Sequence, residues 1–373
     1  MEKIANCTNS VRVTYSTSET LLPTAVALGK FDGLHRGHQR VIQPILNQVR
    51  RQESANTRSQ LRAESSALRG FPPLWRLRRV PSVDQTGVQE TENRRKAGQE
   101  SSPLSRVSLL ERVSPSTFAK EHVYPTVITF HPHPQEFFTG QTHTLLTPLD
   151  EKIQQLQSLG VEQIVLLPFN RELAALTPEE FVKKILVQQL QCRQISVGQD
   201  FRFGRKRSGT ANDLQFLAAK YDIPVTIVPL QTCAGDSPTD STGERISSSL
   251  IRQNLESGDI QRANQLLGRP YTIIGKVVES QLLDRTTGFW SVNLQLPKEK
   301  FLPRQGVYAV RVFDVDETSD AIPLTSCLGV MNIGNCPTVN SKYTFVEVHL
   351  LNWFGDLYGK KLALKLEKFL RPE

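Results

Sequence analysis

The chain has 373 residues, of which 38% are hydrophobic, and a formal net charge of +8. A single hydrophobic core rarely serves this length, so we expect two domains of roughly 150 residues each. The five cysteines are scattered and odd in number, which argues against a disulfide framework and a zinc site. Neither a secretion signal nor a membrane-spanning run is recognisable, so we expect a reducing, cytoplasmic location and no membrane partner.

Much of the positive charge lies in one poorly patterned stretch, rich in Ser, Gln, Glu and Arg, over residues 51–120. Such a composition buries little apolar surface, so we expect a disordered insertion there. Excess positive charge favours anionic partners, and a nucleic-acid-binding arm is one hypothesis for this stretch. We do not favour it, because the stretch lacks regular aromatic spacing and also contains glutamates.

Outside the insertion, the first part of the chain alternates apolar strand patterns with helical ones. TAVALGKF, from Thr24, reads as a buried strand that breaks at Gly29, and residues 35–50 then have helical periodicity. Such alternation predicts an α/β fold, a Rossmann-like parallel sheet with helices on both faces. The further strands are expected at 124–130, 161–169, 194–201 and 223–230, and the further helices at 150–160, 178–190 and 212–223.

After residue 268 the pattern changes to short β-rich runs separated by turn residues. We therefore expect two domains, 1–268 and 269–373, the second being a small antiparallel β-barrel. The six runs are 271–278, 288–296, 306–313, 325–334, 343–351 and 361–370.

The segment GKFDGLHRGH, Gly29 to His38, carries the strongest chemical signal. Its glycines allow a ligand to approach the backbone, and His35 and His38 are three residues apart at a helix start, so they share a face. The free amides and dipole of a helix N-terminus attract phosphate, and two imidazoles there can stabilise charge developing on a phosphate. The segment therefore predicts a phosphate-binding site that needs no protein nucleophile.

This segment resembles the HxGH superfamily of nucleotidyltransferases, and in particular the adenylyltransferase module of the prokaryotic riboflavin kinase/FAD synthetase family. Four further segments, TFHPHPQEFF, LTPLDEKIQQL, VGQDFRFGRKRSG and ERISSSLIR, agree with that family in the same order along the chain. The resemblance implies that the phosphate of FMN attacks the α-phosphorus of ATP, which gives FAD and pyrophosphate. Mg²⁺ would offset the charge of the phosphates.

The resemblance also implies roles for individual residues. The family pattern places Asp32 in positioning or metal contact, although an aspartate there also fits a turn cap. The implied catalytic residues are His35, His38 and Arg252; the nucleotide-binding ones are Gly29, Phe31, Asp32, Gly33, Gly37, Ser247, Ser248 and Ser249; the flavin-binding ones are His131, Pro132, Asn170 and Asp200.

The β-rich part resembles the riboflavin kinase module of the same family, through GVYAV, MNIGNCPTV and VEVHLLNWFGDLYGKKL. The implied reaction is transfer of the γ-phosphate of ATP to riboflavin, with Glu347 as general base and with Ser291 and Asn293 binding nucleotide and Mg²⁺. Trp290 replaces a family proline, and the chain stops at Glu373, where the family usually continues into a helical tail beside the flavin.

The expected substrates are therefore ATP, FMN and riboflavin, and the oligomeric state stays open. The two departures in the second half keep one enzyme alternative open. In that alternative the chain is a monofunctional FAD synthase whose β-domain binds flavin or serves structure only.

Overall fold

A computed structural model describes residues 11–47, 49, 122–232, 243–278, 290–315, 326–335, 344–351, 353 and 357–372. The expected insertion at 51–120 lies outside these residues, as do Gly288 and Phe289 of the segment that resembles the kinase magnesium site. The described parts of both expected domains belong to one compact unit, Met1–Arg50 with His122–Glu373.

The first domain is built on a six-stranded sheet in which all neighbouring strands are parallel, in the order β1-β4-β3-β2-β5-β8. All five residues of β2 are buried, as expected for a central strand covered on both faces. The Rossmann-like prediction is therefore confirmed. The strands are β1 Arg12–Thr14, β2 Thr24–Leu28, β3 Tyr124–His131, β4 Gln163–Pro168, β5 Cys192–Gly198 and β8 Val225–Val228.

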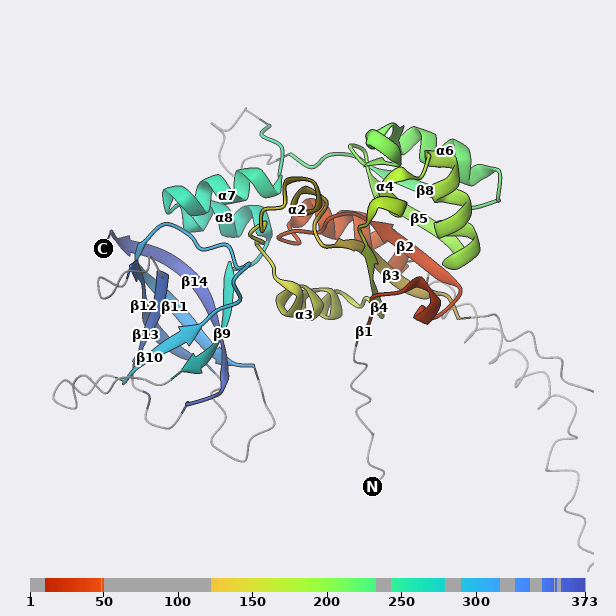
Figure 1. Ribbon diagram of the computed structural model, residues 1–373. Helices are drawn as coiled ribbons and strands as arrows, with labels where there is room; N and C mark the ends of the chain where they lie inside the picture. Colours follow the sequence, from red (N-terminus) through yellow and green to blue (C-terminus); the bar gives the residue numbers. More distant parts are fainter. Residues whose placement is uncertain are drawn as a thin grey trace, which may run out of the picture. The chain divides into compact units, whose positions relative to one another are not determined.

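Helices cover both faces of this sheet (Figure 1). One apolar cluster joins the helix at residues 36–47 and α3 to Ala25 and Ala27, and another joins η3 and α6 to Val26 and Leu28. The alternation along β2 thus divides the core into two layers. The helices are α2 Pro134–Thr139, α3 Leu149–Leu159, α4 Arg171–Ala175, α5 Pro178–Glu180, the π-helix η3 Phe181–Gln189 and α6 Ala211–Ala219; the shorter elements are η1 Thr17–Glu19, β6 Arg202–Phe203, η4 Arg205–Arg207 and β7 Gly209–Thr210.

Two helices, α7 Ser248–Ser257 and α8 Ile260–Leu267, follow the sheet and lie side by side in Figure 1. Each begins at a polar N-cap, because the side chains of Ser247 and Asp259 accept hydrogen bonds from backbone amides in the first turn. Each ends at a glycine with positive φ, Gly258 or Gly268, which is a frequent helix terminator.

The second domain is a closed barrel of six antiparallel strands in the order β10-β13-β12-β11-β14-β9, which confirms the predicted small barrel. Its apolar core is continuous with α7 and α8, because Ile251, Leu255 and Leu266 belong to the same cluster as Tyr271 and Tyr308. The strands are β9 Thr272–Val278, β10 Trp290–Gln295, β11 Gly306–Asp314, β12 Cys327–Asn335, β13 Thr344–Leu350 and β14 Lys361–Arg371.

The segment after β10 also contacts the first domain. Leu145 and Lys300 form a parallel bridge, and the fully buried Lys300 donates to Glu151 Oε2 at 2.6 Å and to the carbonyl oxygen of Leu146 at 2.9 Å. A buried lysine is stable only when its charge is compensated, so this pair fixes the loop before α3 to the segment after β10. In the described part of the chain, no helix is long and apolar enough to span a membrane.

Candidate functional site

The loop after β2 has an unusual backbone. Phe31, Gly33 and Leu34 have φ values of 49°, 87° and 44°, in the left-handed region, yet both Phe31 and Leu34 are completely or almost completely buried. Non-glycine residues in this region cost about 1–3 kcal/mol each and persist where the surrounding core holds them. A Cβ on Gly33 would lie 2.9 Å from Leu146 Cδ1, and one on Gly29 or Gly37 would lie 3.1 Å from the ring of Phe31 or His35. The loop is therefore tightly fitted.

The two histidines predicted to act on phosphate are stacked. The ring centroids of His35 and His38 are 3.7 Å apart with an interplanar angle of 18°. The backbone amide of His38 donates to Nδ1 of His35 at 3.3 Å, so the neutral ring of His35 carries its proton on Nε2. Nδ1 of His38 is buried and has no hydrogen-bond partner in the described part of the chain.

Both imidazoles are neutral in the free protein. Burial lowers the pKa of His35 to about 4, against the opposing charge of Asp32. Burial, followed by the charges of His35 and Lys152, holds the pKa of His38 well below its usual value. Two neutral N–H donors, held in a site with little water, are suited to a phosphate oxygen.

Asp32 joins three segments of the chain. Its Oδ1 accepts hydrogen bonds from the amides of Leu146 and Thr147 at 2.8 and 3.3 Å, and its Oδ2 forms an ion pair with Arg252 at 2.6 Å. The hydroxyl of Ser248 donates to the carbonyl oxygen of Asp32 at 2.8 Å. Both carboxylate oxygens are thus occupied by donors, so this arrangement favours the positioning role of Asp32 over metal contact.

The segment ERISSSLIR leads into α7, and its last five residues, Ser248 to Arg252, form the N-terminal half of that helix, next to this loop. Ser247 caps the helix, Ser248 contacts the loop, and Ser249 is exposed. Arg252 is mostly buried, lies 4.7 Å from the ring centroid of Phe301 and donates to the carbonyl oxygen of Thr144 at 2.6 Å. The structure therefore brings His35, His38, Asp32 and the α7 residues to one end of the sheet.

The predicted flavin contacts divide between two places. His131 ends β3, Pro132 follows it, and Asn170 follows β4. The amide of Phe169 donates to the carbonyl oxygen of His131 at 3.0 Å, so these predicted contacts are neighbours. Asp200 follows β5, on the other side of β2, and pairs with Arg245. Asp200 is therefore separated from the other three by a strand.

An aromatic cluster lies beside His131 and Asn170. Phe169 packs edge-to-face against Phe130, Phe137 and Phe138, with centroid distances of 5.3 to 5.7 Å, and Phe138 is 71% exposed. A large exposed aromatic side chain at the carboxyl end of a parallel sheet is suited to stacking on a flat ligand.

In the barrel, the predicted kinase residues share the outer face of three adjacent strands. Glu347 of β13 pairs in register with Asn293 of β10 and with Asn332 of β12. Ser291 lies opposite His349, and its Oγ is 2.5 Å from His349 Nδ1. Side chains of directly paired residues on one face are close neighbours, so the structure brings Ser291, Asn293 and Glu347 together.

Comparison with known proteins decides which family has this arrangement. The FAD synthetase family model matches residues 17–58 and 108–243, and the riboflavin kinase model matches residues 267–373. The bifunctional riboflavin kinase/FMN adenylyltransferase of Escherichia coli K12 is 38% identical over 256 residues, which is 68% of this chain and 76% of that protein. The chain belongs to the riboflavin kinase/FMN adenylyltransferase family.

Further members of this riboflavin kinase/FMN adenylyltransferase family are similarly related. The protein of Pseudomonas fluorescens is 37% identical and that of Listeria monocytogenes 34%, each over 66% of this chain and 74% of its own. A solved structure described as a macrolide-efflux protein from Streptococcus pneumoniae covers 98% of this chain and 92% of its own, with a TM-score of 0.65 and 22% identity. At that identity the likeness concerns the fold alone.

Several residues of the riboflavin kinase/FMN adenylyltransferase site escaped the sequence reasoning. Thr147 accepts a hydrogen bond from the amide of Gly33 at 2.9 Å, and Arg269 donates to the carbonyl oxygen of Gly33 at 3.0 Å. Lys152, in the first turn of α3, is buried near the same loop. Thr147 and Lys152 lie in LTPLDEKIQQL, a segment that resembles the family, but the resemblance gave them no individual role. For Thr147 and Arg269, the contact with Gly33 joins segments that are distant in the sequence.

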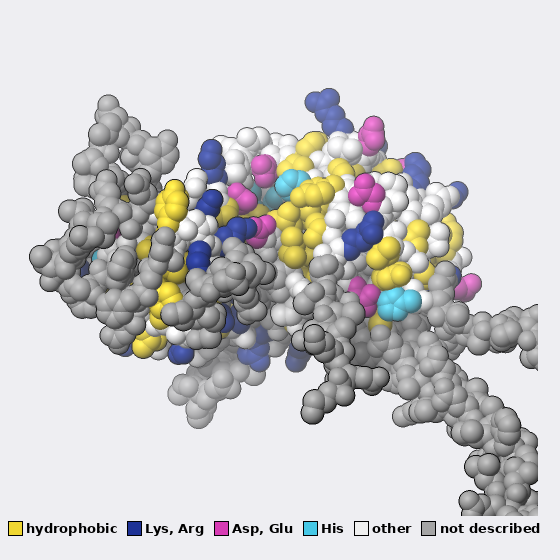
Figure 2. Space-filling view, turned by 90° about the horizontal axis from the view of Figure 1, so that it is seen from below, with side chains coloured by type: hydrophobic (Ala, Val, Ile, Leu, Met, Phe, Trp, Pro, Cys, Tyr) yellow, Lys and Arg dark blue, Asp and Glu magenta, His cyan; other side chains and the backbone are white. Residues whose placement is uncertain are grey.

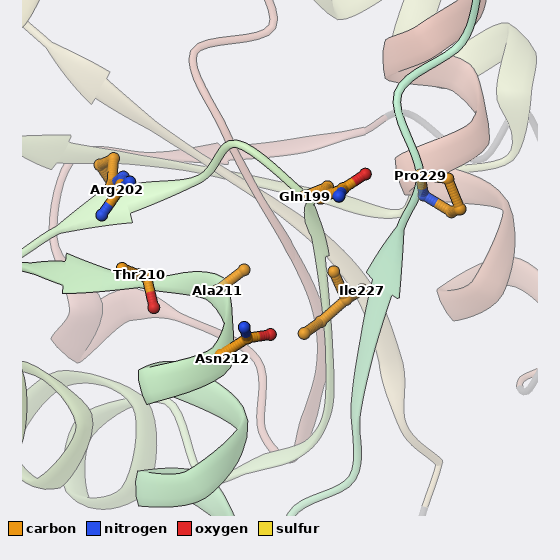
Figure 3. Close-up of a pocket in the computed structure, with 7 residues that line it drawn as sticks. All are labelled: Gln199, Arg202, Thr210, Ala211, Asn212, Ile227 and Pro229. Carbon is orange, nitrogen blue, oxygen red and sulfur yellow. The ribbon is translucent and has the colours of Figure 1, made fainter.

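A cavity of about 520 Å³ lies beyond the carboxyl ends of β5 and β8 (Figure 3). Its walls come from the segment after β5, the start of α6 and the end of β8. None of the predicted site residues lines it, although Gln199 precedes Asp200 in the chain. The lining residues are Gln199, Arg202, Thr210, Ala211, Asn212, Ile227 and Pro229.

Proposed function

We propose that this chain makes FAD in two steps, phosphorylating riboflavin with ATP and then transferring the adenylyl group of a second ATP to FMN. One observation carries the proposal: the stacked, neutral His35 and His38 lie beside the Asp32–Arg252 ion pair at a strand-to-helix turn of a chain that belongs to this family. The matching of both halves to family models favours the two-step activity over the monofunctional alternative.

In the second step, an oxygen of the FMN phosphate forms a bond to the α-phosphorus of ATP, and the bond to the β-phosphate oxygen breaks. The electron pair of that bond leaves with pyrophosphate. His35 and His38 donate N–H groups to oxygens on which charge develops, while Arg252 and the N-terminus of α7 bind the phosphate chain. Asp32 orients Arg252 and fixes the loop.

For FMN, we propose binding against the aromatic cluster at the ends of β3 and β4, next to His131, Pro132 and Asn170. Phe138 and Phe169 would stack on the flavin ring, because both aromatic side chains and flavins favour offset or edge contacts. The role of Asp200 in this proposal is to hold Arg245 on the opposite side of β2.

In the first step, Glu347 would accept the proton of the riboflavin hydroxyl as that oxygen forms a bond to the γ-phosphorus of ATP. The bond from that phosphorus to the β-phosphate oxygen breaks, and its electron pair leaves with ADP. Mg²⁺ would be held by the oxygens of Ser291 and Asn293, and these fit because Mg²⁺ takes oxygen ligands and shares them with substrate phosphates. On the other side of Glu347, across β13, Asn332 Oδ1 is buried without a hydrogen-bond partner in the described residues. When bound, Mg²⁺ offsets the negative charge of ATP.

We propose a cytoplasmic location, where ATP and riboflavin are available, and direct action on small molecules. The nucleic-acid hypothesis comes from residues 51–120, and on the face that Figure 2 shows the Lys and Arg side chains lie among acidic, apolar and uncharged ones. A mixed surface of this kind does not attract nucleic acid strongly.

The decisive experiment supplies the purified chain with ATP and Mg²⁺ and either riboflavin or FMN, and separates the flavins. We expect riboflavin to give FMN and FAD, and FMN to give FAD and pyrophosphate. His38→Asn should stop FAD formation while leaving riboflavin phosphorylation intact. Absence of FAD with the wild-type chain would contradict the proposal, and absence of FMN alone would support the monofunctional alternative.

A further inference from the structure

Phe301 is an aromatic residue of the second half of the chain whose ring contacts an arginine of the proposed ATP site. It lies in the segment after β10, within the residues that match the riboflavin kinase model. The guanidinium carbon of Arg252 lies 4.7 Å from the centroid of the Phe301 ring, and the side chain of Arg252 is only 17% exposed. A cation over an aromatic face at such a distance is attracted to the ring, more strongly where water is excluded.

The backbone of Phe301 is held on both sides. Its amide donates to the carbonyl oxygen of Leu145 at 2.9 Å, and its carbonyl oxygen accepts a hydrogen bond from the hydroxyl of Tyr271 at 2.6 Å. Leu145 in turn donates to the carbonyl oxygen of Glu299 at 2.6 Å. Tyr271 is almost completely buried in the apolar cluster of the barrel, and Phe301 packs against the same cluster. The place of the ring is therefore fixed by contacts with both domains.

Other partners hold the guanidinium of Arg252 within its own plane. Its Nη2 donates to Asp32 Oδ2 and to the carbonyl oxygen of Thr144, both at 2.6 Å, and its Nη1 donates to Thr144 Oγ1 at 3.3 Å. The N–H of Nε and the second N–H of Nη1 have no partner within the described residues, so both can bind a ligand. Bonds in the plane set the direction of these donors, whereas a contact on the face keeps the plane from tilting.

We propose that Phe301 is a positioning residue for adenylyl transfer: its ring supports the face of Arg252, so that the remaining N–H groups of this arginine are held toward the phosphate chain of ATP. The inference rests on the proposed role of Arg252. A planar donor fork binds phosphate oxygens well in only one orientation, so a tilted guanidinium loses part of the contact. A residue within the riboflavin kinase match thus supports the other reaction.

The test measures FAD formation from FMN and ATP by Phe301→Leu, varying each substrate in turn. Leucine keeps most of the apolar volume and removes the aromatic face. We expect the KM for ATP to rise about five- to thirtyfold and the KM for FMN to stay within about twofold. Phe301→Tyr retains the ring and should stay near the wild type. Riboflavin phosphorylation by each preparation should be unchanged, which shows that the variant is folded.

Phe369 of β14 offers a matched control. The guanidinium carbon of Arg304 lies 5.4 Å from the centroid of its ring, and Phe369 packs against the same apolar cluster as Phe301. Phe369→Leu therefore removes a pair of the same kind at another place, and it should leave the KM for ATP in FAD formation within about twofold. Phe301→Met is measured beside Phe301→Leu, so that the result does not depend on the folding of one variant.

A double-mutant cycle separates the support of Arg252 from a general effect on packing. Arg252→Lys keeps a positive charge beside Asp32 but has no planar guanidinium for the ring to orient. In this background Phe301→Leu should change the KM for ATP by less than about twofold. Equal effects of Phe301→Leu in the two backgrounds, an unchanged KM for ATP, or the same rise in Phe369→Leu would each overturn the proposal. If the wild type formed no FAD, the proposed function itself would fail, which is a different result.

Discussion

At the scale of single residues, the site combines neutral histidines with a charged ion pair. His35 and His38 are buried and neutral, whereas the Asp32–Arg252 pair is ionised next to them. A protonated imidazole would bind phosphate more strongly before the reaction as well as during it, which does not lower the barrier. Neutral N–H donors instead gain strength as charge develops on the phosphate oxygens.

The lowered pKa of His35 predicts a pH dependence of stability. Its pKa is about 4 in the folded chain, against an ordinary value near 6.5, so the unfolded chain binds a proton first as pH falls. The contribution of His35 to the free energy of unfolding is fully present above about pH 6.5. As the pH falls from about 6.5 to 4, the free energy of unfolding decreases by roughly 3 kcal/mol. Urea denaturation at pH 7.5, 5.5 and 4.5 should show a shallower decline for His35→Asn.

A single substitution at Glu347 should separate the two activities. Glu347→Gln keeps the shape of the side chain but removes the base, so riboflavin phosphorylation should fall about 100- to 10,000-fold. FAD formation from supplied FMN should be unchanged, because His35 and His38 lie in the other domain. Measuring both reactions with each substrate checks this, and equal loss of both would show that Glu347 acts on the whole fold instead.

At the scale of elements, the glycine-rich loop keeps its shape because neighbouring segments bind its backbone. Thr147 binds the amide of Gly33, Arg269 binds the carbonyl oxygen of Gly33, and Ser248 binds that of Asp32. The side chains of Phe31 and Leu34 are buried in the apolar core and hold the same loop against the domain. The catalytic geometry is therefore a product of three segments that are distant in sequence.

Removing the hydrogen bond between Thr147 and Gly33 should lower FAD formation and leave riboflavin phosphorylation unchanged. Thr147→Val leaves the buried amide of Gly33 without an acceptor, at a cost of about 1–3 kcal/mol, and should lower kcat/KM for FAD formation about tenfold or more. Thr147→Ser retains the hydroxyl and should stay near the wild type. Riboflavin phosphorylation should be the same in all three proteins. A normal rate of FAD formation with Val would show that the loop does not need this bond.

Much of the first domain and of the barrel could be predicted from the sequence, because strand and helix periods reflect local burial. The motif from Gly29 to His38 and the α7 segment also lie together as their patterns indicated. The contacts of Thr147 and Arg269 with Gly33 could not be predicted, since each joins segments more than a hundred residues apart. The separation of Asp200 from His131 depends on strand order, which local patterns do not specify.

At the scale of the whole molecule, the apolar core of the barrel extends into α7 and α8. If the chain were divided at residue 268, Ile251, Leu255 and Leu266 would lose their apolar contacts with the barrel. The expected boundary therefore predicts a barrel fragment without α7 and α8, whereas the packing predicts one that includes them. The stability of the two fragments can therefore test where the domain boundary lies.

We predict that a fragment of residues 244–373 is more stable than one of residues 269–373. The shorter fragment exposes barrel residues that α7 and α8 cover, and burial of each large aliphatic side chain contributes about 1.5–3 kcal/mol. Thermal unfolding followed by circular dichroism should give the longer fragment the higher and sharper transition. Equal transitions would show that the helices are not needed by the barrel and would support the boundary at residue 268.

Lys300 and Asp32 hold the same short stretch of backbone from opposite sides. The ammonium of Lys300, in the segment after β10, binds the carbonyl oxygen of Leu146, and the amide of Leu146 binds the carboxylate of Asp32. The peptide groups of one residue thus connect the segment after β10 to the loop that carries His35 and His38, so a change at Lys300 would reach that loop through two hydrogen bonds.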